Sequence, residues 1–186
     1  MPDLIFRVER AVLKKKLVVI GAGLIGREHC DLVRANPGSE LVGIADISKA
    51  AQQYAEEINT PYFSNYLEML DEISVNGAII ALPNAFHSEA GCACISRGIP
   101  CLVEKPIADT VIMAQRLVEA SERSGVAVLV GHHRRHSPDI HMAKRLIQEG
   151  MIGRVIAVNG MWLADKPENY FSANWRRMSG GGPLLI

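Results

Sequence analysis

A glycine-rich turn between an apolar run and a helical pattern is the feature that most restricts how this chain can fold. The apolar run is Leu17-Val18-Val19-Ile20, and the turn is Gly21-Ala22-Gly23-Leu24-Ile25-Gly26. In a strand–turn–helix unit, the first glycine permits the tight turn and the second removes a side chain that would block a pyrophosphate. The third lets the helix pack against the strand. Because the free N–H groups at the helix start then face the phosphates, the sequence predicts a dinucleotide-binding site.

An acidic residue follows at the spacing that such a site requires. A second apolar run, residues 41–45, ends in Asp46, twenty residues after Gly26. A carboxylate at the tip of the second strand can accept hydrogen bonds from a ribose 2′-hydroxyl and would repel a 2′-phosphate, which favours NAD over NADP. The competing interpretation is an α/β domain that binds no nucleotide, in which Asp46 caps the next helix. The strand context and the spacing of the acid favour the dinucleotide-binding interpretation over this one.

The remainder of the chain alternates between short apolar runs and helical patterns. Strands are expected at residues 16–20, 41–46, 61–63, 77–81, 100–104 and 126–131, and helices at 24–35, 48–58, 65–71, 86–97, 109–124 and 140–148. This alternation predicts an α/β fold, a doubly wound parallel Rossmann sheet whose apolar strands are covered on both faces. After residue 136 the rhythm changes, and a new strand at 155–163 begins an incomplete α+β second domain. The expected organisation is an extension (1–15), a Rossmann domain (16–136) and the start of a second domain (137–186).

The amino-acid composition limits the kinds of partner that the protein can be expected to bind. The formal net charge is zero, so no basic field recommends nucleic acid or an anionic membrane. No apolar stretch approaches the ~20 residues of a membrane helix, and the first residues lack a secretory signal pattern, so we expect a cytoplasmic protein. The four cysteines match neither a zinc site nor a redox pair. His132 and His136 have a helical zinc spacing, but Pro138 and the lack of a nearby acidic ligand argue against a metal.

The tripeptide Glu104-Lys105-Pro106 ends the fifth expected strand. Ligands of open α/β sheets bind beyond the carboxyl ends of the strands. Pro106 restricts Lys105 to extended backbone geometry, so the lysine projects from the strand tip, where it can act as a general acid or base. The alternative is a solvated Lys-Pro turn without a catalytic role, which is less favoured in a chain that also carries a nucleotide-binding turn.

Taken together, these motifs resemble the Gfo/Idh/MocA oxidoreductases over residues 16–186. The matching segments are residues 21–26, Glu104-Lys105-Pro106, Gly131…Arg135…Pro138, residues 150–153, and Trp175-Arg176 followed by three glycines. The resemblance implies a Rossmann domain followed by an α/β domain with a large open sheet, and a tightly held NAD(P). It also implies a cis Lys105–Pro106 bond and a catalytic role for Lys105. Members continue past the triple glycine, so the resemblance implies that this chain is a fragment, a truncated product or a partial chain.

The turn, the acidic residue and the matched motifs together give a set of candidate site residues. Lys105 is the expected catalytic residue. The residues expected to bind the cofactor are Gly21, Gly23, Leu24, Ile25, Gly26, Asp46, Leu82, Pro83, Asn84, His87, Glu104, Lys105, Pro106, Arg135, Trp175 and Arg176. The expected cofactor is NAD, with NADP less favoured, and no metal is expected.

The function that this resemblance implies is hydride transfer between a nicotinamide and a sugar, polyol or related hydroxy or keto substrate. Two alternatives stay open at this point. One is a non-catalytic nucleotide-binding protein or an inactive truncated paralogue. The other is a glycosidase or lyase of the same family that recycles its NAD. A homo-oligomer is expected for full-length members, with neither nucleic acid nor a membrane as a partner.

Overall fold

The computed structural model describes residues 13–161, 163, 165, 170, 172 and 174–177. Its core is one six-stranded sheet in which every strand pairs in parallel with its neighbours, in the order β3-β2-β1-β4-β5-β6. The strands are β1 (Lys15–Ile20), β2 (Ser39–Ala45), β3 (Tyr62–Phe63), β4 (Gly77–Ile80), β5 (Cys101–Val103) and β6 (Val128–Val130). This order is that of the dinucleotide-binding doubly wound fold, which confirms the predicted fold class.

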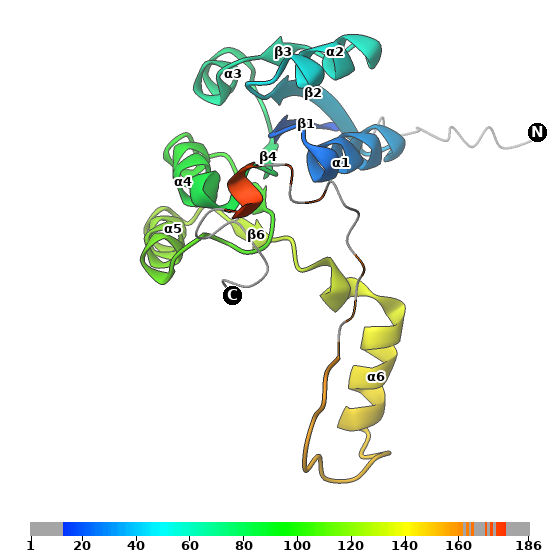
Figure 1. Ribbon diagram of the computed structural model, residues 1–186. Coiled ribbons are helices and arrows are strands. Elements are labelled where there is room, and N and C mark those ends of the chain that lie inside the picture. Colours follow the sequence, from blue (N-terminus) through cyan, green and yellow to red (C-terminus); the bar gives the residue numbers. More distant parts are fainter. Residues whose placement is uncertain are drawn as a thin grey trace, which may run out of the picture.

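Helices connect the strands and cover the sheet (Figure 1). They are α1 (Leu24–Ala35), α2 (Lys49–Glu57), α3 (Tyr66–Glu72), α4 (His87–Ser96), α5 (Val111–Ser124) and α6 (Pro138–Gln148). Three short 3-10 helices, η1 (Asn84–Phe86), η2 (His133–His136) and η4 (Asn174–Arg177), complete the described elements. The predicted boundaries of these strands and helices differ from the observed ones by at most two residues.

Successive residues of β1 point into two separate cores. Val18 and Ile20 pack with side chains of α3, α4 and α5, whereas Val19 packs with side chains of α1 and α2. Alternation of this kind follows from the period of two in a strand. Both layers are needed, because β1 is fully buried along this stretch and each face must meet apolar side chains.

Local capping explains where several helices begin and end. The side chains of Ser48 and Thr110 accept hydrogen bonds from main-chain N–H groups in the first turns of α2 and α5. Gly125 ends α5 in the left-handed conformation, with φ of 70°. The start of α2 and the end of α5 therefore follow from ordinary capping chemistry.

The chain after η2 departs from the prediction. Helix α6 forms, but it stands away from the sheet and buries none of its residues (Figure 1). The strand predicted at 155–163 does not form over residues 155–161, where Ile156 and Val158 are 88% and 87% exposed. A strand needs a neighbour to accept and donate its ladder hydrogen bonds, and none is described beside this segment. Residues 1–12 of the expected extension and residue 162 lie outside the described part of the chain.

The backbone of α1 approaches the turn that precedes it closely. A Cβ atom placed on Gly26 would lie 1.8 Å from the carbonyl oxygen of Gly21 and 3.6 Å from the Cβ of Ala81. Nothing larger than glycine fits there without moving α1 away from β1. The third glycine of the turn thus acts through packing, as the sequence predicts.

We expect Gly26→Ala to lower the free energy of unfolding by about 3 kcal/mol, because the added methyl group must displace backbone rather than a side chain. Urea denaturation of the purified chain measures this loss. Gly23→Ala is the matched control, since no atom lies within 4 Å of a Cβ at Gly23 and its φ is −69°. Equal stability of the two variants would contradict the packing role of Gly26.

Candidate functional site

Four loops meet at the carboxyl edge of the sheet. Ile20 of β1 pairs with Ala45 of β2 and with Ile80 of β4, and Ile80 in turn pairs with Val103 of β5. The residues that follow these partners therefore emerge side by side. Helices leave β1 and β4 toward opposite faces of the sheet, and ligands of open α/β sheets bind at such a point.

The glycine turn between β1 and α1 leaves an open cradle. Gly21 has a φ of 93°, and a Cβ there would lie 2.7 Å from the carbonyl oxygen of Ala81. At Gly23, by contrast, a Cβ would meet no atom within 4 Å. Gly23 precedes the first turn of α1, whose Leu24 and Ile25 are exposed. Open space in front of free main-chain N–H groups fits a pyrophosphate.

Asp46 is fixed by two main-chain groups at the end of β2. Its Oδ2 accepts a hydrogen bond of 2.7 Å from the N–H of Ala22, and its Oδ1 accepts one of 2.8 Å from the N–H of Ser48. The Tyr62 hydroxyl donates to the main-chain carbonyl of Asp46. Because an ionised carboxylate has about four acceptor positions, Asp46 retains capacity for a ribose hydroxyl.

Arg27 supports the same turn, and the motif alone did not reveal it. Its Nε donates to the carbonyl of Ala22 over 3.2 Å, and its Nη2 donates to the carbonyl of Ala50 over 2.8 Å. The guanidinium also lies over the ring of Tyr54, 4.6 Å from the centroid. Arg27 therefore ties the glycine turn to α2. The sequence signal is only its position directly after Gly26.

The loop after β4 divides into an accessible part and a buried one. Leu82, Pro83 and Asn84 are partly exposed at the carboxyl edge. His87 is 1% exposed, with Nδ1 2.8 Å from the carbonyl oxygen of Pro106 and Nε2 2.7 Å from that of Leu82. Because His87 is buried, its side chain has no surface that a ligand could contact. It can therefore affect cofactor binding only through the loops that it holds. The ring joins the loops after β4 and β5.

Glu104 and Lys105 separate at the tip of β5, as opposite strand faces predict. The carboxylate of Glu104 lies 3.0 Å from Nε2 of His29 on α1 and accepts the N–H of Lys105 over 3.2 Å. Lys105 is exposed, and the Lys105–Pro106 bond is cis, as the resemblance implies.

The surroundings of Glu104 have opposing effects on the pKa of its carboxyl group. Burial alone would raise the pKa of this carboxyl, but the hydrogen bonds from His29 and from the Lys105 N–H, together with nearby positive charge, lower the pKa overall. A lowered pKa means that the carboxylate stabilises the fold above the ordinary glutamate pKa of about 4.3. This stabilisation disappears as the pH falls through the lower folded-state value.

We expect Glu104→Gln to cost about 1.5–3 kcal/mol of stability at pH 7, the usual value of a hydrogen bond to a charged group. The difference from wild type should shrink as the pH falls below the ordinary glutamate range, because the stabilisation by the carboxylate is lost as Glu104 takes up its proton. Urea denaturation at pH 7 and at lower pH values measures both terms. Glu119→Gln on α5, where the carboxylate is exposed, is the control. The same loss at all these pH values would rule out an ionic contribution from Glu104.

The last three predicted residues lie outside this cluster or are only partly described. Arg135 is exposed within η2, which follows β6. Trp175 and Arg176 belong to η4, and the side chain of Trp175 lies outside the described part of the chain. The guanidinium of Arg176 lies 4.1 Å from the ring centroid of Tyr170 and donates to its carbonyl.

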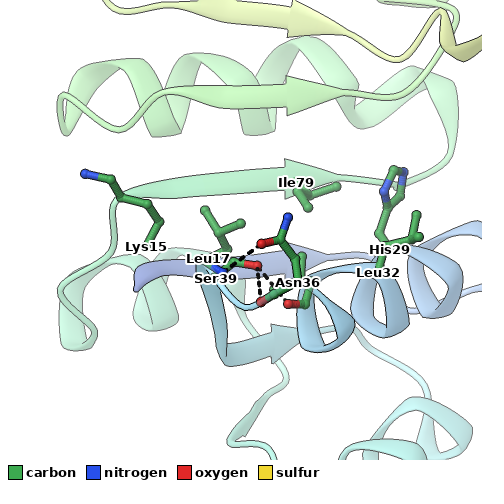
Figure 2. Close-up of a pocket in the computed structure, with 9 residues that line it drawn as sticks. Lys15, Leu17, His29, Leu32, Asn36, Ser39 and Ile79 are labelled. Atoms are coloured by element: carbon green, nitrogen blue, oxygen red, sulfur yellow. Dashed lines mark hydrogen bonds between the residues drawn. The ribbon is translucent and has the colours of Figure 1, made fainter. Parts of the chain in front are cut away.

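A shallow depression of about 460 Å³ lies elsewhere on the sheet (Figure 2). Its lining includes Lys15 and Leu17 of β1, Ile79 of β4, and Leu32 and Asn36 of α1. These residues lie away from the carboxyl edge, so the depression is distinct from the glycine cradle. Across the described residues, no three His, Cys, Asp or Glu side chains gather as metal ligands, and no helix is long and apolar enough to cross a membrane.

A glycine cradle, an acid at the end of β2 and the strand order together define a dinucleotide-binding Rossmann protein. The model of the Gfo/Idh/MocA family, described as an oxidoreductase family with an NAD-binding Rossmann fold, matches residues 15–132. This match spans more than half of the chain, and the chain belongs to that family.

Curated relatives and solved structures agree with this assignment. Inositol 2-dehydrogenase 2 of Saccharopolyspora erythraea is 34% identical over 147 residues, covering 77% of this chain and 43% of that protein. A 2,7-anhydro-N-acetylneuraminate hydratase of Mediterraneibacter gnavus is 27% identical, covering 88% of this chain and 44% of that protein. The WlbA dehydrogenase of Bordetella pertussis, solved with NADH and UDP-GlcNAcA, superposes with a TM-score of 0.72 at 26% identity, covering 76% and 44%. The chain thus spans about half the length of the relatives it matches.

Proposed function

We propose that this chain binds NAD at the carboxyl edge of its sheet and supplies the nucleotide half of a dehydrogenase for sugars, polyols or related hydroxy or keto compounds. The observation that carries this proposal is the open space in front of Gly23, beside the fixed carboxylate of Asp46. Relatives named for inositol and for sugar derivatives support the substrate class. A cytoplasmic location and a homo-oligomer belong to the same proposal.

Each part of the edge has a distinct task. The N–H groups at the start of α1 hold the pyrophosphate, and Asp46 accepts hydrogen bonds from the adenosine ribose. When bound, the nicotinamide supplies the hydride chemistry. The ammonium of Lys105, exposed on the tip of β5, gives a proton to the substrate oxygen or, as the amine, removes one. His87 holds the loop that carries Lys105, because its ring contacts the carbonyl of Pro106.

We expect Gly23→Ala to weaken NADH binding at least tenfold, about 1.4 kcal/mol, while the chain stays folded. The methyl group would occupy the space in which the pyrophosphate lies, and it touches no protein atom. Fluorescence titration of NADH measures the affinity, and thermal unfolding checks the fold. NADPH is titrated in parallel, since Asp46 should also disfavour a 2′-phosphate at least tenfold. Unchanged NADH affinity in Gly23→Ala would contradict the proposal that the pyrophosphate binds at this turn.

We expect Lys105→Met to reduce turnover about 10²–10⁴-fold and to leave NADH affinity within about twofold, because loss of a proton-transferring group acts on the reaction rather than on nucleotide binding. Turnover is followed at 340 nm on a panel of polyols and sugars, in a protein that includes this chain. Lys144→Met, an exposed lysine on α6, is the control. Full turnover in Lys105→Met would exclude the lysine from the mechanism.

One relative favours a second candidate function. The hydratase of Mediterraneibacter gnavus covers 88% of this chain, and its name describes addition of water rather than net oxidation. A protein of this type would use the same Lys105 proton transfer without releasing NADH. Steady release of NADH during turnover supports the dehydrogenase, whereas product without net NADH supports the recycling enzyme. NADH binding without turnover of any panel member would support a non-catalytic nucleotide-binding protein.

A further inference from the structure

Two histidines hold the main chain on either side of Lys105. His87 of α4 contacts the carbonyl oxygen of Pro106, which follows Lys105, and His29 of α1 contacts the carboxylate of Glu104, which precedes it. Helices α4 and α1 pack on opposite faces of the sheet, because their buried side chains belong to different cores. The lysine therefore lies between two anchors, and only the one from His87 has a task in the function proposed above.

The Glu104 carboxylate connects His29 to the main chain of Lys105. Its Oε1 lies 3.0 Å from Nε2 of His29, and its Oε2 accepts the N–H of Lys105 over 3.2 Å. Because an ionised carboxylate can only accept, Nε2 of His29 carries the hydrogen, as it does in imidazolium and in one neutral tautomer. Each oxygen of Glu104 thus has its own partner, and a rotation of the carboxylate would break both contacts.

The contact between His29 and Glu104 is sheltered from solvent. The two side chains are 18% and 15% exposed. Burial raises the pKa of Glu104, and the hydrogen bond from His29 is the largest of the effects that lower it, followed by the Lys105 N–H and the charges of both residues. A sheltered pair of this kind adds little net stability compared with apolar side chains of the same size, so stability alone is a weak reason for it. What the pair does provide is a defined orientation of the carboxylate.

Gly131, at the end of β6, closes the remaining side of the carboxylate. A Cβ at Gly131 would lie 2.9 Å from Oε1 of Glu104 and 3.3 Å from its Cα. The main chain cannot easily withdraw, because the N–H of Gly131 donates to the carbonyl of Val103 over 2.8 Å. The oxygen that bonds His29 is therefore held between α1 and the end of β6. This contact also gives a physical reason for glycine at a position that the proposed function does not use.

We propose that His29 is a positioning residue for Lys105. By bonding one oxygen of Glu104, it directs the other to the Lys105 N–H and fixes the main chain from which the lysine side chain extends. The inference rests on the proposed function, because it takes Lys105 as the group that transfers the proton. A displacement of about 1 Å can reduce turnover on the order of a hundredfold, so a fixed starting point matters for a long side chain.

The position of His29 on α1 has a second consequence. The first turn of α1 is the proposed binding site of the pyrophosphate, and His29 is the sixth residue of the same helix. One rigid helix therefore connects the site of the nucleotide to the strand tip that carries Lys105. In this arrangement, the lysine and the nicotinamide keep a constant relation whenever the nucleotide is bound.

The first test measures turnover of the polyol and sugar panel in a protein that includes this chain. We expect His29→Leu to reduce kcat by about tenfold or more and to leave NADH affinity within about twofold. His29→Gln, whose side-chain amide still donates an N–H, should restore kcat to within about threefold of wild type. His141→Leu, an exposed histidine on α6, is the control. Wild-type kcat in His29→Leu, or equal losses in His29→Leu and His29→Gln, would overturn the proposal.

The second test uses NMR and needs neither substrate nor cofactor. The amide signal of Lys105 is followed as the pH is lowered, because it reports on protonation of its acceptor, Glu104. We expect a midpoint below the ordinary glutamate pKa of about 4.3 in wild type and a higher midpoint in His29→Leu, where the hydrogen bond that lowers the pKa of Glu104 is lost. His29→Gln should raise the midpoint less, and His141→Leu should leave it unchanged.

The two tests together separate the positioning role from the proposed function. A midpoint that His29→Leu leaves unchanged would overturn the link from His29 through Glu104 to Lys105, whatever the turnover. If the midpoint rises as expected but the wild-type chain does not bind NADH, the proposed function is contradicted while the link stands. A raised midpoint together with reduced kcat and intact NADH binding in His29→Leu supports both.

Discussion

The close approach of Gly26 to the carbonyl of Gly21 is the constraint on which the geometry of the candidate site depends. With no side chain between them, α1 starts immediately after β1, and its free N–H groups come to the carboxyl edge of the sheet. The same approach places Gly23 in front of open space. Because β2 and β4 flank β1, the loops that carry Asp46 and Leu82 are fixed relative to this turn by the sheet itself. The close backbone contact therefore positions the cradle, and the strand pairing brings the acid and the neighbouring loop to it.

Most of the Rossmann domain could be predicted because its signals are local. Apolar strand runs, capping residues such as Ser48 and Gly125, and the glycine turn each act within a few residues of sequence. The cis Lys105–Pro106 bond was implied only by the resemblance. The strand expected at 155–163 does not form over the described residues 155–161, since pattern predicts which residues suit a strand but cannot supply the neighbouring strand that completes it.

The contacts that sequence reasoning missed are long-range and use common residue types. In the sequence, nothing distinguishes His29 and Arg27 from other polar residues of a helix. The fold places Glu104 at the tip of β5 within 3.0 Å of His29, and it places Tyr54 of α2 against the guanidinium of Arg27. His87 is expected beside the cofactor because it matches the family's loop after the fourth strand, but it begins a helix whose first turn faces inward. A motif identifies the loop that forms a site, whereas burial decides which of its side chains a ligand can reach.

The strand order also separates two ways of holding negative charge. At β1, the proposed diphosphate would meet main-chain N–H groups, while the arginine of this turn, Arg27, bonds the carbonyls of Ala22 and Ala50. At β6, three positions along the sheet, the positive charge belongs to the side chains of residues 132–136 instead. The strand order therefore keeps this side-chain charge apart from the N–H groups at the start of α1. Lys105 at the tip of β5 lies between the two regions, where the proposed nucleotide and substrate would meet.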